Sequence, residues 1–99
     1  MFDKLKNFNE MMRKAKEVKS ALSQINVEAS AANGKIKMTF DGENILKSLS
    51  IDDEYLNPSK KSELEKLLKN CIQDGVKMSQ KEAAKKMKDI MGVDVPGLF

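Results

Sequence analysis

The fold is decided by residues 27–56, VEASAANGKIKMTFDGENILKSLSIDDEYL, where apolar and polar residues alternate and turn signals mark both bends. Asn33-Gly34 supplies the positive φ angles that a tight two-residue hairpin requires. A second bend falls at residues 41–44, which include Asp41-Gly42. The stretch therefore predicts a three-stranded antiparallel meander.

The alternation also predicts which side of this sheet is apolar. Side chains two residues apart along a strand lie on the same face. The residues expected on the apolar face are Ile36, Met38, Phe40, Leu49 and Ile51. Three strands with one apolar face are not stable alone in water, so we expect the flanking segments to cover it.

Both flanking segments have the periodicity of helices. Residues 1–25 carry apolar side chains at steps of three and four, after a plausible N-cap at Asp3. A second helix is expected over residues 58–91, entered at Asn57-Pro58 and stopped before Gly92. Gly75 and Ser79-Gln80 leave open a break near residues 75–80. Residues 26–56 then form the sheet and residues 92–99 a non-helical tail, within one domain spanning 1–99.

The second helix has a broad apolar face that continues past the expected end of the sheet. Its members include Leu68, Ile72, Ala83, Met87 and Ile90. Beyond Ser79 the face narrows to the last three of these, which suit contact with another helix. The simplest partner is a second copy of the chain, so we expect a homodimer.

Composition narrows the class of function. The 99 residues contain no histidine and one cysteine, Cys71, on the apolar face of a helix. No general base, structural zinc site or catalytic nucleophile is therefore predicted. Asp52-Asp53-Glu54 is interpreted as the polar end of a strand with capping roles. We expect no enzymatic activity, metal, cofactor or small-molecule substrate.

Neither a signal peptide nor a membrane-spanning segment is indicated, because the first residues are charged and no apolar run is long enough. A cytoplasmic protein is expected. The net charge of +3 is concentrated on the helices: residues 1–24 sum to +3, whereas residues 25–58 sum to −3. A polyanion partner is compatible with this distribution.

Four lysines follow one side of the second helix at steps of three and four residues: Lys77, Lys81, Lys85 and Lys88. Such a row can follow a phosphate backbone, although lysine-rich faces also serve solubility. Arg13 is the only arginine, and arginine is the usual reader of guanine, so little sequence discrimination is expected. The alternative hypothesis is a protein-interaction module that docks its projecting helices onto a partner protein.

A set of residues in a fixed order and spacing extends over nearly the whole chain. It comprises Met1-Phe2, Met11, Met12, Lys14 and Ala15, then Gly34, Lys37, Phe40, Asp41-Gly42, Leu49-Ser50-Ile51-Asp52 and Leu56, then Leu64, Leu67-Leu68, Asp74 and Pro96-Gly97-Leu98-Phe99. This pattern resembles the YbaB/EbfC family of small bacterial nucleoid-associated DNA-binding proteins. The resemblance implies an α+β protomer of order α-β-β-β-α and a tight homodimer with projecting helical arms.

The same resemblance implies broad binding of double-stranded DNA in the nucleoid, in some relatives with effects on gene expression. We place this role on basic residues that the helical pattern also exposes. They are Arg13, Lys14 and Lys16 in the first helix and Lys77, Lys81, Lys85 and Lys88 in the second.

Overall fold

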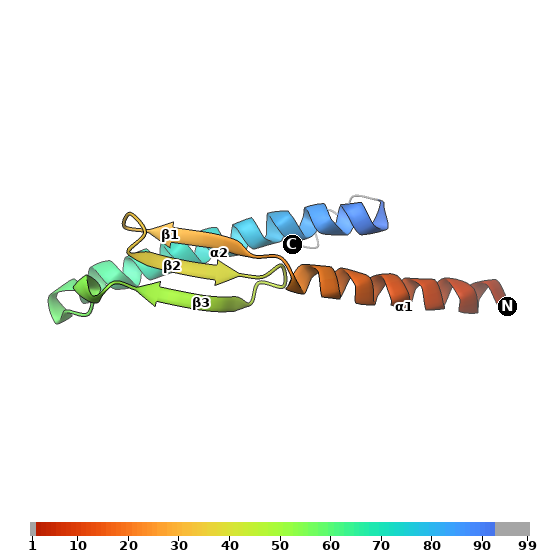
Figure 1. The fold of residues 1–99 in the computed structure, drawn as a ribbon, viewed down its shortest axis with the longest axis horizontal. Coiled ribbons are helices and arrows are strands. Elements are labelled where there is room, and N and C mark those ends of the chain that lie inside the picture. The colour runs from red at the N-terminus through yellow and green to blue at the C-terminus, as the bar shows by residue number, and fades with distance from the viewer. Residues whose placement is uncertain (1, 93–99) are drawn as a thin grey trace.

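Two long helices and one small sheet make up the part of the chain that the structure, a computed structural model, describes: residues 2–92, with side chains from Lys6 onward. The elements are α1 (Phe2–Ser23), β1 (Val27–Ala31), β2 (Ile36–Phe40), β3 (Leu46–Ile51), two short 3₁₀ helices η1 (Asp53–Tyr55) and η2 (Pro58–Lys60), and α2 (Lys61–Met91). The predicted α-β-β-β-α order is confirmed (Figure 1). Of the expected tail 92–99, all but Gly92 lies outside the described residues.

The sheet is antiparallel, with strand order β1-β2-β3. The β1–β2 connection differs from the predicted two-residue turn, because residues 32–35 form a longer loop. Asn33 and Gly34 have the expected positive φ angles of 58° and 86°, but Ala32 also has a positive φ of 53°. Three successive left-handed residues therefore make the reversal, and β2 begins only at Ile36.

The β2–β3 bend is fixed by one buried aspartate. The Asp41 carboxylate accepts backbone hydrogen bonds from Glu43 at 2.7 Å and Ile45 at 3.1 Å. The Asp41 carbonyl accepts a hydrogen bond from the hydroxyl of Ser79, which is buried in α2. Asp41 thus organises the bend and attaches it to the long helix.

The main core lies between α2 and the strands β1 and β2. Its most buried members include Ile36, Met38, Phe40 and Cys71. The possible break near residues 75–80 is absent, because α2 is continuous from Lys61 to Met91. At Gly75 the aromatic ring of Phe40 occupies the space that a Cβ would need, 2.2 Å from the ideal Cβ position. The glycine therefore serves close packing rather than a bend.

Strand β3 lies outside the cover that α2 provides. Leu49 pairs with Met38 and therefore lies on the same face of the sheet, yet it is 49% exposed. A bulge at Lys47 brings Leu46 opposite Phe40, and Leu46 is 42% exposed. The predicted direction of Leu49 and Ile51 is correct, because they pair with Met38 and Ile36, but a single chain leaves this part of the apolar face open to solvent.

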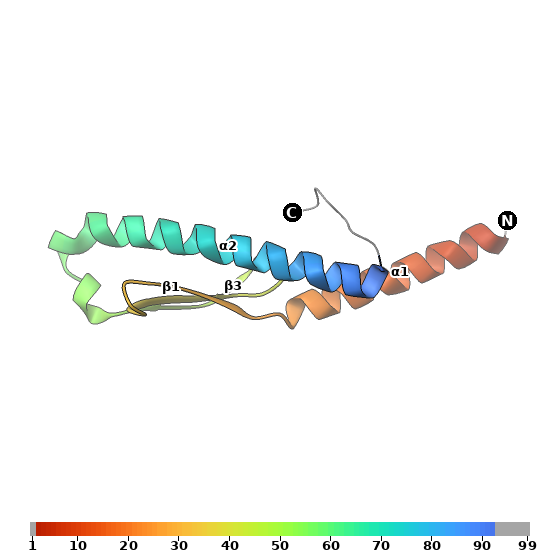
Figure 2. The same cartoon turned by 90° about the horizontal axis from the view of Figure 1, so that it is seen from above.

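A second, smaller core joins the two helices. Val18 and Leu22 of α1 are buried against Ala83 of α2, with Met87 and Ile90 packed beside them. The expectation that Ala83, Met87 and Ile90 meet a second copy is therefore wrong: they meet α1 of the same chain. The reason is that α1 runs antiparallel beside the C-terminal half of α2 (Figure 2).

The first half of α1 projects beyond this contact. Residues 6–17 are all exposed, including the large apolar side chains of Phe8, Met11 and Met12. The molecule is accordingly long and thin, 67 × 20 × 17 Å. Its radius of gyration of 18.3 Å exceeds the roughly 13 Å of a compact domain of this size.

Candidate nucleic-acid interface

The outer side of α2 carries a row of exposed lysines. Ser79 and Ala83 are buried and mark the inner side of the helix. Residues two positions away from them are turned by about 200°, which places them on the outer side. We call Lys77, Lys81, Lys85 and Lys88 the lysine row; all four are exposed, as the helical pattern predicts.

Within the lysine row, Lys85 has an acidic neighbour on the same helix. The Nζ atom of Lys85 lies 3.4 Å from Oε1 of Glu82, and both side chains are substantially exposed. An exposed ion pair of this kind is worth little and is easily exchanged for another partner. Lys85 therefore stays accessible to an anion.

The basic residues predicted in α1 lie on its projecting part. Arg13, Lys14 and Lys16 are exposed and precede Val18, the first buried residue of α1 from Lys6 onward. Figure 1 shows that α1 is antiparallel to α2 and extends past the C-terminal end of α2. The basic part of α1 therefore lies beyond the contact of Val18 and Leu22 with α2, in the direction of the C-terminal end of α2.

Other lysines are occupied by structural contacts. Glu54 forms an ion pair with Lys35, and its carboxylate also lies 3.6 Å from the Nζ of Lys60. The hydrogen bond that Lys35 donates to the Glu54 carboxylate raises the pKa of Lys35 and lowers the pKa of Glu54. Lys47 donates a 2.9 Å hydrogen bond to the carbonyl of Ser23 at the end of α1. These three lysines stabilise junctions of the fold and are poorer candidates for ligand contact.

The acidic run after β3 has the capping role that was expected. The Asp52 carboxylate accepts a 2.9 Å hydrogen bond from the backbone N–H of Glu54, as the N-cap of η1. Within residues 2–92, no group of three or more histidine, cysteine, aspartate and glutamate residues could hold a metal ion. Burial raises the pKa of the Cys71 thiol, which disfavours the thiolate that a nucleophile needs.

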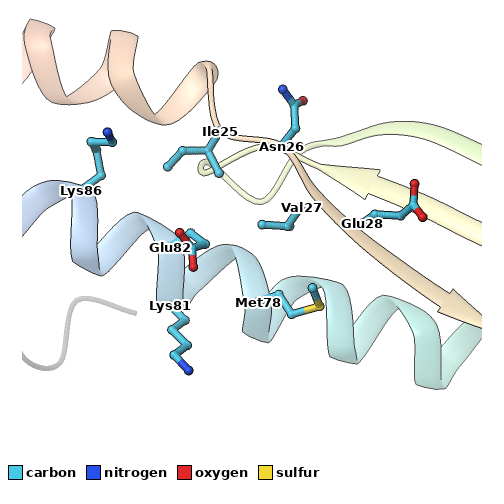
Figure 3. A pocket seen from close by; sticks show the side chains of 8 residues that line it. All are labelled: Ile25, Asn26, Val27, Glu28, Met78, Lys81, Glu82 and Lys86. Atoms are coloured by element: carbon cyan, nitrogen blue, oxygen red, sulfur yellow. The ribbon is translucent and has the colours of Figure 1, made fainter.

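A groove of about 660 Å³ lies between the start of β1 and residues 78–86 of α2. It was not predicted from the sequence. Its lining includes Ile25, Val27, Met78, Glu82 and Lys86 (Figure 3). Lys81 borders the same groove but extends away from β1 in this view. The groove depends on where the α1–β1 connection meets α2, which no local pattern specifies.

The described helices contain no segment with both the length and the apolar character to cross a membrane. Two of the exposed basic groups of this part of the chain, the lysine row and Arg13, Lys14 and Lys16, lie on the long helices. Amino and guanidinium groups arranged in this way can contact successive phosphates without reading bases.

Comparisons with known proteins identify the family of this chain. The sequence profile of the YbaB/EbfC DNA-binding family matches residues 1–93. A nucleoid-associated protein of Caldicellulosiruptor saccharolyticus is 26% identical, with 94% of this chain and 88% of that protein covered. A nucleoid-associated protein of Beijerinckia indica is 29% identical, with coverages of 93% and 91%.

The fold itself recurs in a solved structure. An uncharacterized protein of Helicobacter pylori superposes with a TM-score of 0.75 at 20% identity, covering 93% of this chain and 98% of the other. Family profile and fold therefore agree over almost the whole length. The chain belongs to the YbaB/EbfC DNA-binding family.

Proposed function

We propose that this nucleoid-associated protein binds duplex DNA through the lysine row of α2 and through Arg13, Lys14 and Lys16 of α1. The observation that carries the proposal is the lysine row, an unburied line of cations on the outer side of a long helix. Membership of a DNA-binding family supports the choice of polyanion. Binding requires no chemical step, and the site of action is the nucleoid.

The spacing of the lysine row suits a phosphate backbone. From Lys77 to Lys88 the helix rises on the order of 16 Å, at 1.5 Å per residue. Phosphates on one strand of duplex DNA follow one another at about 3.4 Å along the axis. Four long, flexible ammonium groups over that length can reach several phosphates. With Arg13 as the one arginine, base readout contributes little and the binding is broad.

We further propose that the active form is a homodimer joined through the uncovered apolar face. We define the apolar band as Ile45, Leu46, Leu49 and Ile51 near β3 together with Leu68, Ile72 and Val76 of α2. Met78 lines the groove beside β1, whereas Ile72 and Val76 line a separate hollow on α2. Leu49 and Ile72 are 49% and 43% exposed in one chain. Apolar side chains of this size favour burial against a second copy.

Salt dependence tests the DNA contact. We expect the logarithm of the association constant for a random-sequence duplex to fall linearly with the logarithm of salt concentration, with a slope of about −0.9 per phosphate contacted. Changing Lys77, Lys81 and Lys85 to Glu together removes three contacts, so binding weakens and the slope becomes shallower by about 3. An electrophoretic mobility-shift titration at several salt concentrations measures both quantities.

A matched variant distinguishes the effect of lysine position on DNA binding from the effect of net charge. Lys61, Lys66 and Lys69 are exposed near the start of α2, and changing them to Glu alters the net charge by the same amount. This control should retain most of the affinity and slope. Equal losses in both variants would show that overall charge, rather than the lysine row, determines binding.

The apolar band has its own test. Leu49→Lys and Ile72→Lys place charges in the proposed interface, and both positions tolerate them in a single chain because they are exposed. We expect sedimentation to show dimers for the unmodified protein and mainly monomers for the double variant, with unchanged helix content. A double variant that stays dimeric would exclude the apolar band as the interface.

A further inference from the structure

Strand β1 forms the edge of the sheet opposite β3. The hydrogen-bond register shows which of its backbone groups are directed outward. The N–H of Asp52 donates to the carbonyl of Lys35, so odd-numbered residues of β2 bond to β3 and even-numbered ones to β1. The β1 residues opposite Ile36, Met38 and Phe40 therefore bond to β2, which leaves the N–H and C=O groups of Glu28 and Ser30 directed outward.

This edge lacks the devices that usually prevent strands from pairing. Edge strands are commonly interrupted by proline, lysine or a bulge. The β1 sequence VEASA contains neither proline nor lysine, and its pairing with β2 is regular throughout. In contrast, the β3 edge carries both Lys47 and a bulge. The edge of β1 is thus the one suited to accept another strand.

The outward N–H and C=O groups of β1 can pair with the same groups of a second copy of the chain. In an antiparallel pair of two β1 strands related by a two-fold axis at Ala29, Glu28 of each copy lies opposite Ser30 of the other. The N–H and C=O groups of both residues then satisfy each other, giving four backbone hydrogen bonds. Glu28 meets a neutral side chain, and two small alanines meet at the axis, so neither like charges nor bulk oppose the pairing.

We propose that two copies pair through β1, edge to edge, and that this contact links dimers into rows on DNA. The inference rests on the proposed function, because a row needs two contacts per protomer and the second contact is the dimer interface proposed at the apolar band. The two contacts lie on opposite edges of one sheet, so each protomer can make both at once. Two different two-fold contacts on opposite edges of the sheet allow the pairing to continue from one dimer to the next, which is what a row requires.

The groove beside β1 can accommodate part of a second copy of the chain. It lies next to Val27 and leaves space for side chains that a second α2 would bring alongside. Its rim holds both signs of charge, with Glu28 and Glu82 against Lys81 and Lys86. A mixed rim can face a copy of itself without net repulsion.

Four hydrogen bonds over a five-residue strand make a weak contact by themselves. Two dimers bound side by side on one duplex hold their β1 edges at a high effective concentration, which strengthens such a contact. The expected signature is therefore cooperative binding to long DNA, together with assemblies larger than the dimer in concentrated solution.

Ser30→Pro tests the pairing, because proline removes an outward N–H that the β1–β2 ladder does not use. Ser30→Ala is the matched control, since it removes the hydroxyl and keeps the N–H. In sedimentation without DNA, the unmodified protein and Ser30→Ala should form species above the dimer mass as concentration rises, whereas Ser30→Pro should stop at the dimer. Identical masses for all three would overturn the inference.

Amide exchange provides a readout that needs no variant. The amides of Glu28 and Ser30 should exchange several-fold more slowly at high than at low protein concentration. The amide of Ser59 in η2, which donates to Asn57 within its own turn, should not change. Unchanged rates at Glu28 and Ser30 would count against pairing even if Ser30→Pro fails to fold.

DNA binding separates this inference from the function on which it rests. On a duplex long enough for several dimers, Ser30→Pro should lose cooperativity, while its affinity for a duplex of one site stays within about two-fold of the unmodified protein. Retained cooperativity would refute the β1 contact and leave DNA binding intact. If no variant binds DNA, the proposed function fails, and the masses measured without DNA still decide the pairing.

Discussion

Gly75 lies on the inner side of α2, directly against the ring of Phe40. An alanine Cβ at this position would lie 2.2 Å from Cε2 and 2.5 Å from Cδ2 of that ring, whereas ordinary contacts begin near 3.4 Å. Phe40 is buried between α2 and the sheet, so its ring has little room to move. Gly75→Ala therefore tests whether this close approach controls stability.

Two opposing terms determine the expected size of the effect. Alanine is favoured over glycine inside a helix by about 1 kcal/mol. Overpacking a close-packed core costs about 1–3 kcal/mol, and a shift of more than 1 Å belongs at the upper end of that range. The free energy of unfolding should thus fall by about 2 kcal/mol, although helix propensity alone predicts a gain.

Urea unfolding followed by circular dichroism at fixed protein concentration measures this difference. The midpoint should fall by about 1 M, since a small domain has a slope of about 1–3 kcal/mol per M. Combining Gly75→Ala with Phe40→Leu, which shortens the opposing side chain, should recover part of the loss beyond additivity. A Gly75→Ala protein as stable as the original would refute the packing argument.

Two other contacts lead to predictions about the free energy of unfolding. Ser79→Ala leaves the buried Asp41 carbonyl without its donor and should lower the free energy of unfolding by about 1–3 kcal/mol, while Ser59→Ala, at an exposed site, should change it little in the same urea assay. The pKa of Glu54 lies below its ordinary value of 4.5, so its ion pair stabilises the fold above that pH and the contribution is lost as pH falls through the lowered pKa. The stability difference between Glu54→Gln and the unmodified protein should consequently be present at neutral pH and vanish in acid, as thermal unfolding across pH would show; a constant difference would contradict the ion pair.

Periodicity predicted the faces of the elements well, because a face depends only on local geometry. The burial of Ile36, Met38 and Phe40 and the exposure of the lysine row follow directly from steps of two in strands and of three and four in helices. Periodicity does not specify the partner of a face. Ala83, Met87 and Ile90 pack on α1 because the chain reverses direction, and no local signal distinguishes that arrangement from a dimer.

The remaining differences arise where tertiary contacts override local preference. From the sequence, Gly75 indicates a possible helix break. In the structure, the ring of Phe40 occupies the space beside this glycine and the helix continues. Likewise, the sequence does not distinguish Lys35 and Lys47 from other surface lysines. In the fold, Lys35 pairs with Glu54 and Lys47 bonds to the carbonyl of Ser23. The candidate DNA-contacting lysines could be selected from sequence, whereas the lysines that stabilise junctions could not.

The projecting half of α1 has a thermodynamic consequence. Residues 6–17 are exposed, so their helical state depends on short-range propensity without support from a core. Isolated helices of this length are marginal in water, which places the local unfolding free energy of this segment close to zero. Each cation it carries therefore samples a range of positions at little energetic cost, and capture by a partner would convert a fluctuating segment into a fixed one.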